Sequence, residues 1–177
     1  MAVITVKDKQ FETYLSDEMI QSRIRELAAE INRDYAGTKP LFIAILNGSF
    51  MFAADLFKNL DIEAEICFIK LASYKGMKST GKVVTSIGLE EDLFGKDVII
   101  VEDIVDTGKT LHHFLPKLKH QQPRSLKIAT LLHKKEATQY PLHPDYTGFE
   151  IPNKFVVGYG LDYDGLGRNL KEIYQLV

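Results

Sequence analysis

The stretch Val101-Glu-Asp-Ile-Val-Asp-Thr-Gly-Lys-Thr110 decides the fold and the chemistry predicted for this 177-residue chain. It continues the apolar run 98–101, which is typical of a strand buried on both faces. Two acids end this predicted strand, a third follows at Asp106, and the small residues of 107–110 lead into a predicted helix. Main-chain N–H groups at such a turn, together with the helix dipole, favour an anion. Because the acids would repel a bare phosphate, Mg²⁺ or sugar hydroxyls are expected between them.

The end of this stretch also has part of the P-loop pattern of nucleotide-binding proteins. That motif requires a glycine five residues before Gly108, where this chain has Asp103, so a kinase or ATPase is disfavoured. A second alternative is that Glu102, Asp103 and Asp106 only form a solvated strand end and a helix cap. The Thr-Gly-Lys-Thr sequence directly after them makes a phosphate site the better interpretation.

Composition limits the possible classes of protein. The chain has the length of one domain, 45% hydrophobic residues and a net charge of −2 without any block of like charges. This composition disfavours a nucleic-acid or membrane-surface role. The single Cys67 permits no internal disulfide, and no run approaches the ~18 apolar residues of a spanning helix. We therefore expect one cytoplasmic domain over residues 1–177.

Helices and strands are predicted to alternate along the chain. Ser16 is a suitable N-cap for an amphipathic helix over 15–35, and Pro116 should kink or shorten a later helix. The predicted helices cover 15–35, 50–60 and 110–119, and the predicted strands cover 41–46, 64–71, 83–87, 98–101, 126–133, 154–158 and 173–177. The polar segment 73–81 should be a mobile surface loop. This order predicts an α/β fold, with a mainly parallel central sheet flanked by helices and a small hood over the site.

The central stretch resembles the phosphoribosyl-diphosphate signature of the type I phosphoribosyltransferases, and especially its hypoxanthine-guanine branch. The resemblance covers most of the chain in the same order. Leu46-Asn-Gly48 looks like the family's diphosphate-binding loop, and Ser73-Tyr74 matches the serine-tyrosine pair of its mobile catalytic loop. Leu131-Leu-His-Lys134 ends at the family's purine-recognising lysine. The segment 154–163 is similar to the one that stacks on the base and reads its edge.

The resemblance implies a purine salvage enzyme of the type I phosphoribosyltransferase fold. Such an enzyme transfers the 5-phosphoribosyl group from phosphoribosyl diphosphate to N9 of hypoxanthine or guanine, giving IMP or GMP and diphosphate. Asp106 would be the catalytic general base at the purine N7. Mg²⁺ would be the cofactor, associated with Glu102, Asp103 and Asp162.

The resemblance also implies the substrate contacts. Lys134 would select the 6-oxo group, Phe155 would stack on the base, the Val156 main chain would read the 2-substituent, and Arg168 would contact the diphosphate. The substrate-binding residues implied in this way are Gly48, Ser73, Tyr74, Glu102, Asp103, Thr107, Gly108, Lys109, Thr110, Lys134, Phe155, Val156, Asp162 and Arg168.

Several points stay open at the level of sequence. Many relatives carry a basic residue where this chain has Asn47, and 164–167 is richer in glycine than expected. The preference among hypoxanthine, guanine and xanthine is undetermined, and an enzyme of the same fold acting on adenine or a pyrimidine is the nearest rival. A regulator of this fold that binds RNA or DNA is disfavoured, because such binding requires a basic face. A homodimer or homotetramer is implied by the resemblance only.

Overall fold

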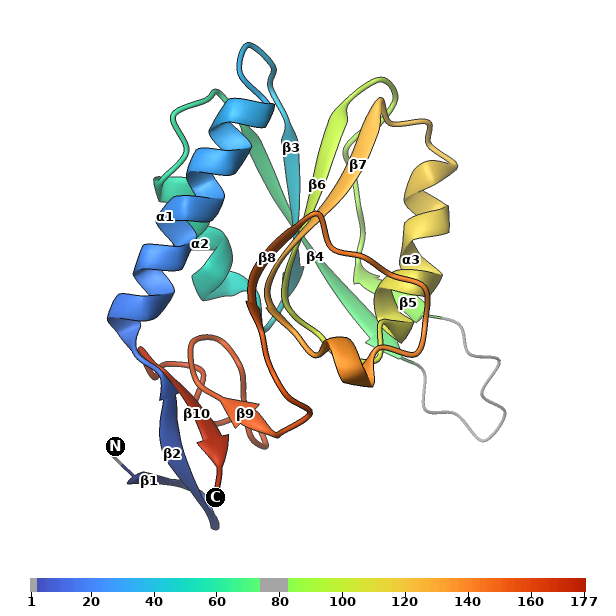
Figure 1. Ribbon diagram of the computed structural model, residues 1–177. Helices are drawn as coiled ribbons and strands as arrows, with labels where there is room; N and C mark the ends of the chain where they lie inside the picture. Colours follow the sequence, from blue (N-terminus) through green and yellow to red (C-terminus); the bar gives the residue numbers. More distant parts are fainter. Residues whose placement is uncertain (1–2, 74–82) are drawn as a thin grey trace.

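The computed structural model describes residues 3–73 and 83–177, and the side chains of 72, 73 and 83–87 are left out of the description. Ten strands and three α-helices make up the described chain (Figure 1). In order they are β1 (Val3–Val6), β2 (Lys9–Leu15), α1 (Asp17–Asp34), β3 (Leu41–Leu46), α2 (Phe50–Lys58), β4 (Glu65–Ser73), β5 (Val83–Ile87), β6 (Asp97–Val105), α3 (Lys109–Lys119), β7 (Ser125–His133), the 3₁₀ helix η1 (Lys135–Ala137), β8 (Tyr146–Glu150), β9 (Val156–Val157) and β10 (Ile173–Leu176).

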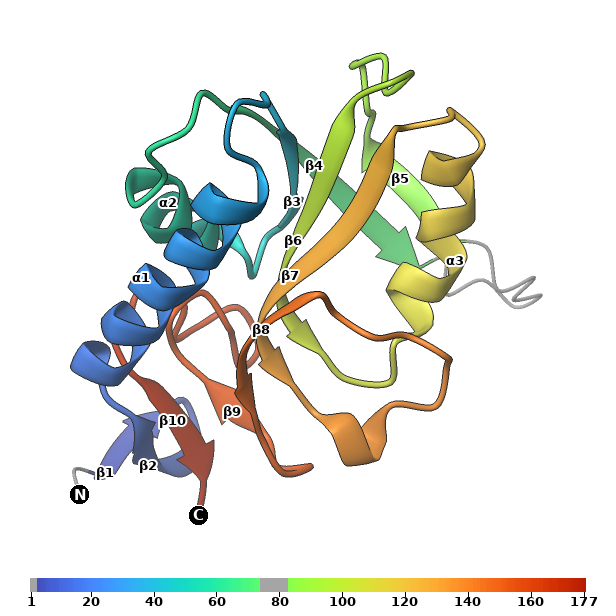
Figure 2. The same cartoon turned by 45° about the horizontal axis from the view of Figure 1, so that its top comes forward.

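The larger sheet has the strand order β5-β4-β3-β6-β7-β8. All neighbouring strands from β4 to β8 run parallel, and β5 pairs antiparallel with β4 at one edge. Helices α1 and α2 cover one face and α3 covers the other, as both views show (Figures 1 and 2). The central strand β3 is buried along nearly its whole length, as expected for a strand covered on both faces. The predicted mainly parallel sheet is confirmed.

A second, antiparallel sheet joins the two ends of the described chain. Its order is β1-β2-β10-β9, and it has its own small core formed by Val6, Phe11, Val157 and Tyr174. We call this sheet, together with the connecting segment 158–172, the hood. It lies beyond the first turn of α1, at the end of the molecule where β6 and β7 finish (Figures 1 and 2).

The predicted helices agree with the structure. Ser16 caps α1 by accepting a hydrogen bond from the Met19 amide at 3.3 Å. Helix α3 covers the predicted segment and contains Pro116. In the part of the chain that the structure describes, no helix combines the length and hydropathy required to cross a membrane.

Two strand predictions need correction, and three strands were missed. The strand predicted over 98–101 continues to Val105, so the first two acids of the signature lie within β6 and not after it. The strand predicted over 154–158 is reduced to the two residues of β9. The hairpin β1–β2 and the strand β8 were not predicted. Strand β8 is short and contains Gly148. A Cβ added at Gly148 would lie 2.4 Å from the Leu131 carbonyl oxygen. Glycine therefore permits the close approach of β8 to β7.

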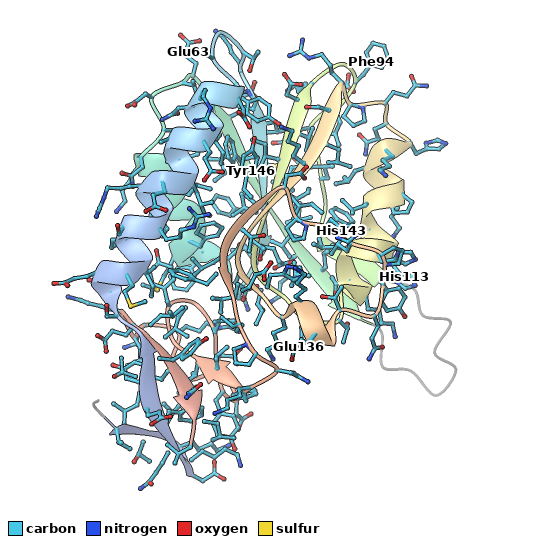
Figure 3. The ribbon with its side chains drawn as sticks, in the orientation of Figure 1. Glu63, Phe94, His113, Glu136, His143 and Tyr146 are labelled. Atoms are coloured by element: carbon cyan, nitrogen blue, oxygen red, sulfur yellow. The ribbon has the colours of Figure 1, made fainter. Side chains whose placement is uncertain are left out.

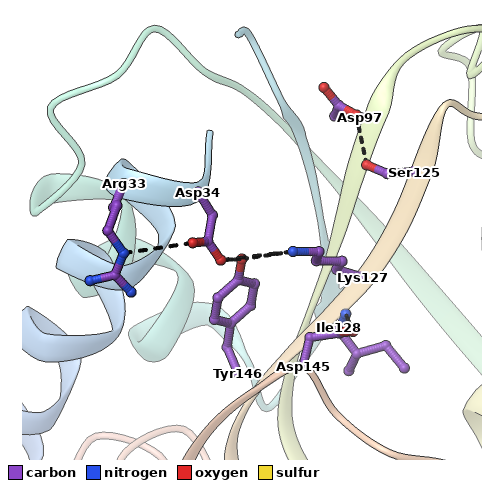
Figure 4. A network of polar contacts seen from close by, with 8 residues as sticks. All are labelled: Arg33, Asp34, Asp97, Ser125, Lys127, Ile128, Asp145 and Tyr146. Carbon is purple, nitrogen blue, oxygen red and sulfur yellow. Dashed lines mark hydrogen bonds and ion pairs between the residues drawn. The ribbon is translucent and has the colours of Figure 1, made fainter. Parts of the chain in front are cut away.

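The starts of β6 and β7 are joined by polar contacts at the end of the sheet opposite the hood (Figure 4). The Asp97 carboxylate accepts hydrogen bonds from the Arg124 guanidinium and, at 2.7 Å, from the Ser125 hydroxyl. Nearby, the Tyr146 hydroxyl donates to Asp34 at 2.6 Å. These contacts fix the strand starts, and the opposite strand ends carry the residues of the candidate site.

Candidate active site

The residues singled out in the sequence gather at the carboxyl ends of three neighbouring parallel strands. Strand β3 leads into Asn47 and Gly48, β6 carries the acidic signature, and β7 leads into Lys134. Side chains after adjacent parallel strands meet at one edge of the sheet, which is where open α/β sheets bind ligands. Figure 3 shows Glu136 on η1 and His113 on α3 at this end of the molecule.

The turn 107–110 forms an open cradle at the start of α3. Gly108 is the N-cap of this helix and has φ +81°, a left-handed conformation that glycine adopts readily. Across residues 3–73 and 83–177, the main-chain N–H groups of Thr107 and Gly108 donate to no other group of the protein. The cavity beside the turn is lined by 102–111 together with Ile45 and Leu71. Such unpaired amides at a helix start are suited to bind an anion.

Two adjacent acids lie at the back of this cavity. Glu102 is 8% exposed, and burial raises the pKa of its carboxyl well above the usual value, with the neighbouring charge of Asp103 adding to the effect. Burial also raises the pKa of Asp103, while a hydrogen bond with Glu102 and the charge of Arg168 oppose the increase. The pair therefore favours a nearby cation, which would stabilise both carboxylates in the ionised form.

Gly48 allows the main chain after β3 to contact these acids. A Cβ added at Gly48 would lie 1.6 Å from Oδ2 of Asp103, so no larger residue fits without moving that carboxylate. The Leu46–Asn47 peptide bond just before it is cis. Gly160 of the hood has φ +96°, and a Cβ there would lie 2.1 Å from the Gly48 carbonyl oxygen. Two glycines thus bring the loop after β3, the acids of β6 and the hood into direct contact.

The acids fit a magnesium ion that brings part of its coordination shell with the substrate. Mg²⁺ commonly binds one or two carboxylates, keeps several waters and takes further oxygens from phosphates. The described residues contain no group of three or more His, Cys, Asp or Glu side chains placed to hold a metal. Asp162 is engaged elsewhere: it pairs with Arg168 at 2.8 Å and accepts the Gly165 amide at 2.7 Å. Its association with a metal stays a prediction.

A second cavity adjoins the first and shares Asp103, Ile104 and Asp106 with it. Its lining is Asp103, Ile104, Asp106, Lys134, Phe155, Val156, Leu161 and Asp162. At the junction, Nζ of Lys134 lies 3.1 Å from Oδ2 of Asp106. Lys134 is 7% exposed, and its amide donates to the Val105 carbonyl at 2.9 Å, so both its main chain and its ammonium group are fixed.

The hood supplies the aromatic wall of the second cavity. Phe155 is 44% exposed and lies just before β9. Its ring is 6.2 Å from that of Phe11 and 5.9 Å, edge to face, from that of Tyr163. An exposed aromatic face held by two other rings is suited to stack on a planar ligand.

Arg168 of the hood lines neither cavity, and its contacts connect the hood to the acids. It donates to the Gly160 carbonyl at 2.7 Å, in addition to its ion pair with Asp162. Its charge acts on Asp103, and Gly160 contacts Gly48. The structure therefore brings Arg168 close to Gly48, in the loop that resembles the family's diphosphate-binding loop.

Most of the predicted residues meet at the two cavities. Tyr74 lies outside the described residues, and for Ser73 only the main chain, at the end of β4, is described. Sequence reasoning missed the other apolar lining, namely Ile45, Leu71, Ile104, Val105, Leu111 and Leu161. Apolar residues in strands and helices predict a core, so their type gave no signal. Only the position of Leu161 within the segment 154–163 could have indicated it.

Comparison with known proteins agrees with this arrangement. Residues 11–164 match the family model of the phosphoribosyl transferase domain. The chain is 45% identical over 166 residues to a hypoxanthine phosphoribosyltransferase of Buchnera aphidicola, covering 92% of this chain and 94% of the relative. It is 39% identical over 173 residues to a hypoxanthine-guanine phosphoribosyltransferase of Aquifex aeolicus, covering 97% of each. The crystal structure of a hypoxanthine-guanine phosphoribosyltransferase from Bacillus anthracis superposes with a TM-score of 0.89 at 41% identity, covering 94% of this chain and 98% of the other.

Proposed function

This chain belongs to the phosphoribosyl transferase family, and from that premise we propose that it is a hypoxanthine-guanine phosphoribosyltransferase of purine salvage. The enzyme transfers the 5-phosphoribosyl group of phosphoribosyl diphosphate to N9 of a 6-oxopurine and releases diphosphate. The observation that carries the proposal is the pair of adjoining cavities. One has an anion cradle beside the buried Glu102 and the half-buried Asp103, and the other has an aromatic wall and a buried lysine.

The first cavity is proposed to bind the sugar phosphate. The amides of 107–110 would hold the 5′-phosphate at the start of α3. Glu102 and Asp103 would hold the ribose hydroxyls and the cation. When bound, Mg²⁺ supplies a Lewis acid for the negative charge that develops on the departing diphosphate. The raised pKa values of these two acids support a cation at this place.

The second cavity is proposed to bind the purine. As the bond between C1 and the diphosphate oxygen breaks, N9 of the base bonds to C1, and the purine N7 gives up its proton. Asp106 would accept that proton, a contribution of about 10²–10⁴ in rate for a positioned base. Lys134 would donate to O6, which selects against adenine because its 6-amino group is itself a donor. Phe155 would stack on the ring, and the Val156 main chain would read the 2-substituent.

The leaving diphosphate is proposed to lie between Gly48 and Arg168. Support comes from the contact of Gly48 with Asp103 and Gly160, and from the hydrogen bond between Arg168 and Gly160. Because Asn47 is neutral, Arg168 would provide the main positive side chain there. The family resemblance also implies that Ser73 and Tyr74 help to exclude water, which would otherwise hydrolyse the activated sugar, and Tyr74 lies outside the described residues.

One assay tests the function. The protein is mixed with phosphoribosyl diphosphate, Mg²⁺ and one base at a time, and diphosphate release is measured. Hypoxanthine or guanine should give turnover that EDTA abolishes and excess Mg²⁺ restores, while adenine should give none. Xanthine, tested in the same way, would decide the specificity at position 2 of the ring. Turnover with adenine alone, or with no purine, would contradict the proposal.

The family resemblance also underlies the rest of the proposal. It includes a cytoplasmic location and assembly as a homodimer or homotetramer. Sedimentation measurements at several protein concentrations would test the assembly, and a monomer at all of them would contradict it.

A further inference from the structure

Thr138 lies outside both cavities, just after η1, and contacts the main chain of two site segments. Its hydroxyl oxygen is 3.0 Å from the carbonyl oxygen of Asp106 and 3.1 Å from that of Lys134. Nε2 of the buried His133 lies 3.2 Å from the same hydroxyl. The Lys134 carbonyl already accepts from the amides of Ala137 and Thr138, so we assign the single hydroxyl hydrogen to the Asp106 carbonyl. The hydroxyl oxygen is then the acceptor for His133 in the tautomer that carries its proton on Nε2.

The contact with Asp106 determines how an amide of the phosphate cradle points. The Asp106 carbonyl and the Thr107 N–H belong to the same planar trans peptide and point in opposite directions. The Thr138 hydroxyl holds the Asp106 carbonyl toward Thr138. The Thr107 N–H of the same peptide therefore points away from Thr138. That N–H donates to no group among the described residues, and Thr107 lines the first cavity.

The residues after Thr138 fix the next peptide in the same way. The amides of Gln139 and Tyr140 donate to the Thr107 carbonyl at 3.0 and 3.3 Å. The Gly108 N–H, which shares that peptide, is turned away from 139–140. The methyl carbon of Thr138 would lie 3.6 Å from a Cβ built on Gly108, so its side chain also packs beside this residue. The segment 138–140 thus backs the cradle along two successive peptides.

We infer that Thr138 is a positioning residue that orients the main chain of the phosphate loop relative to Lys134. It joins the proposed 5′-phosphate cradle and the proposed purine lysine through one hydroxyl group. The inference rests on the proposed function, which assigns the first cavity to the sugar phosphate and the second cavity to the purine of one nucleotide. Thr138 itself contacts no substrate in this arrangement.

Three variants separate alignment from stability. Thr138→Val keeps the shape of the side chain and its methyl group but removes the hydroxyl, leaving the Asp106 carbonyl without this donor. Thr138→Ser keeps the hydroxyl and loses the methyl. The matched control is Thr130→Val on the same strand as His133: Thr130 is fully buried, its hydroxyl donates to the Leu132 carbonyl at 2.9 Å, and it lines neither cavity.

The measurements are KM and kcat for phosphoribosyl diphosphate and hypoxanthine, the Kd of IMP by calorimetry, and the melting temperature. Loss of one hydrogen bond that orients the cradle should weaken IMP binding and raise KM for phosphoribosyl diphosphate about five- to tenfold in Thr138→Val. Thr138→Ser should stay within about twofold of the wild type, a change no larger than a few tenths of a kcal/mol. Thr130→Val should lower the melting temperature without changing either binding constant.

The outcomes distinguish this inference from the proposed function. If the wild type binds IMP and turns over hypoxanthine, but Thr138→Val matches it in KM and Kd, the inference is wrong. A serine variant as impaired as the valine variant would also overturn it, because packing would then be responsible. If the wild type shows no turnover with any purine, the proposed function fails, and IMP binding still decides the role of Thr138. Should Thr138→Val not fold, Thr138→Ala replaces it with the same expectations.

Discussion

At the scale of single residues, the contact between Lys134 and Asp106 lies where the two cavities join. The lysine is almost fully buried, whereas the Asp106 side chain is 47% exposed and faces both cavities. A half-exposed carboxylate paired with a buried ammonium contributes little net stability after solvent screening. Its exposure is better explained by contact with a ligand, and the proposed proton transfer at N7 requires such access.

Asp106→Asn should therefore reduce turnover while leaving the fold intact. Asparagine has the same shape and still accepts from Lys134, but it cannot take up a proton. We expect kcat with hypoxanthine to fall about 10²–10⁴-fold. The Kd of IMP and the melting temperature should change little. The control is Asp92→Asn, an exposed acid whose carboxylate accepts the Phe94 amide at 3.0 Å. Unchanged kcat in Asp106→Asn would remove Asp106 from the chemistry.

Gly48→Ala tests the close contact between the loop after β3 and the acids. The added Cβ would overlap the Asp103 carboxylate, which must rotate away. A misplacement of about 1 Å at a reacting centre can cost about 100-fold in rate, so a loss of that order in kcat/KM is expected. The Mg²⁺ concentration that gives half-maximal activity should rise as well. The matched control is Gly88→Ala, where a new Cβ has open space and should have no effect. Equal kinetics in the two variants would contradict this account.

From the residues alone, the chemistry of the site could be predicted only where they are consecutive, and the site residues outside 101–110 were predicted through the family resemblance. The acids of β6 and the turn 107–110 lie within one stretch of ten residues, so their spacing alone indicated an anion site. The contacts of Asp106 with Lys134 and Thr138 span 28 and 32 residues. No local pattern encodes such contacts, because they depend on which strands are neighbours. Thr138 gave no signal for this reason.

At the scale of the elements, strands that carry an apolar run were predicted, even the five-residue β5, whereas the hairpin β1–β2 and strand β8 were not. Strands β3 and β6 are buried on both faces and therefore read as continuous apolar segments. Strand β8 contains only five residues, including one glycine, and Arg23 of α1 stabilises it by donating to the Thr147 and Gly148 carbonyls. Strand β8 is held by Arg23 and by its pairing with β7, so its own sequence shows no periodic pattern of apolar residues.

Asp97 provides a pH-dependent link between the starts of β6 and β7. Its hydrogen bonds with the Arg124 guanidinium lower the pKa of the Asp97 carboxyl below the ordinary 3.8, although burial opposes the shift. A carboxyl whose pKa is lower in the folded state stabilises the protein above its ordinary pKa. That contribution is lost as the pH falls through the folded-state value.

Asp97→Asn should therefore lower the free energy of unfolding at pH 7 by about 1 kcal/mol, because charged hydrogen bonds are lost. The difference from the wild type should shrink once the pH falls below about 3.8. Urea unfolding at pH values from 7 to 3 measures this difference in the free energy of unfolding. The kcat at pH 7 should not change, because the candidate site lies at the opposite end of the sheet. Glu63→Gln breaks a fully exposed pair with Lys39 and should have no measurable effect. A constant difference at all pH values would contradict this account.

At the scale of the whole molecule, the site is divided between two sheets. The large sheet carries the phosphate loop and the acids, and the hood carries Phe155 and Val156. The hood pairs segments from the two ends of the described chain, since β2 pairs with β10. The sequence predicted strands over 154–158 and 173–177 but not the hairpin β1–β2 that completes the hood. Binding of the sugar phosphate and of the base should accordingly respond to different substitutions.

Phe11→Leu tests this division from within the hood. Phe11 is fully buried, and its ring lies 6.2 Å from Phe155 and 6.1 Å from Tyr163. Leucine fills less of that space, so the Phe155 ring loses its support and stacks less well on a base. We expect KM for hypoxanthine to rise several-fold, as loss of about 1 kcal/mol of aromatic contact implies, while KM for phosphoribosyl diphosphate stays unchanged.

The matched control for Phe11→Leu is Phe42→Leu in β3. Phe42 is equally buried and contacts Phe57 edge to face at 5.7 Å, but it lies in the core of the large sheet, near the start of its strand. Both variants should lose about 1–2 kcal/mol of stability, and only Phe11→Leu should change KM for the base. Parallel changes of both KM values in Phe11→Leu would mean that the hood and the large sheet act as one unit. The division of the substrate between the two sheets would then be wrong.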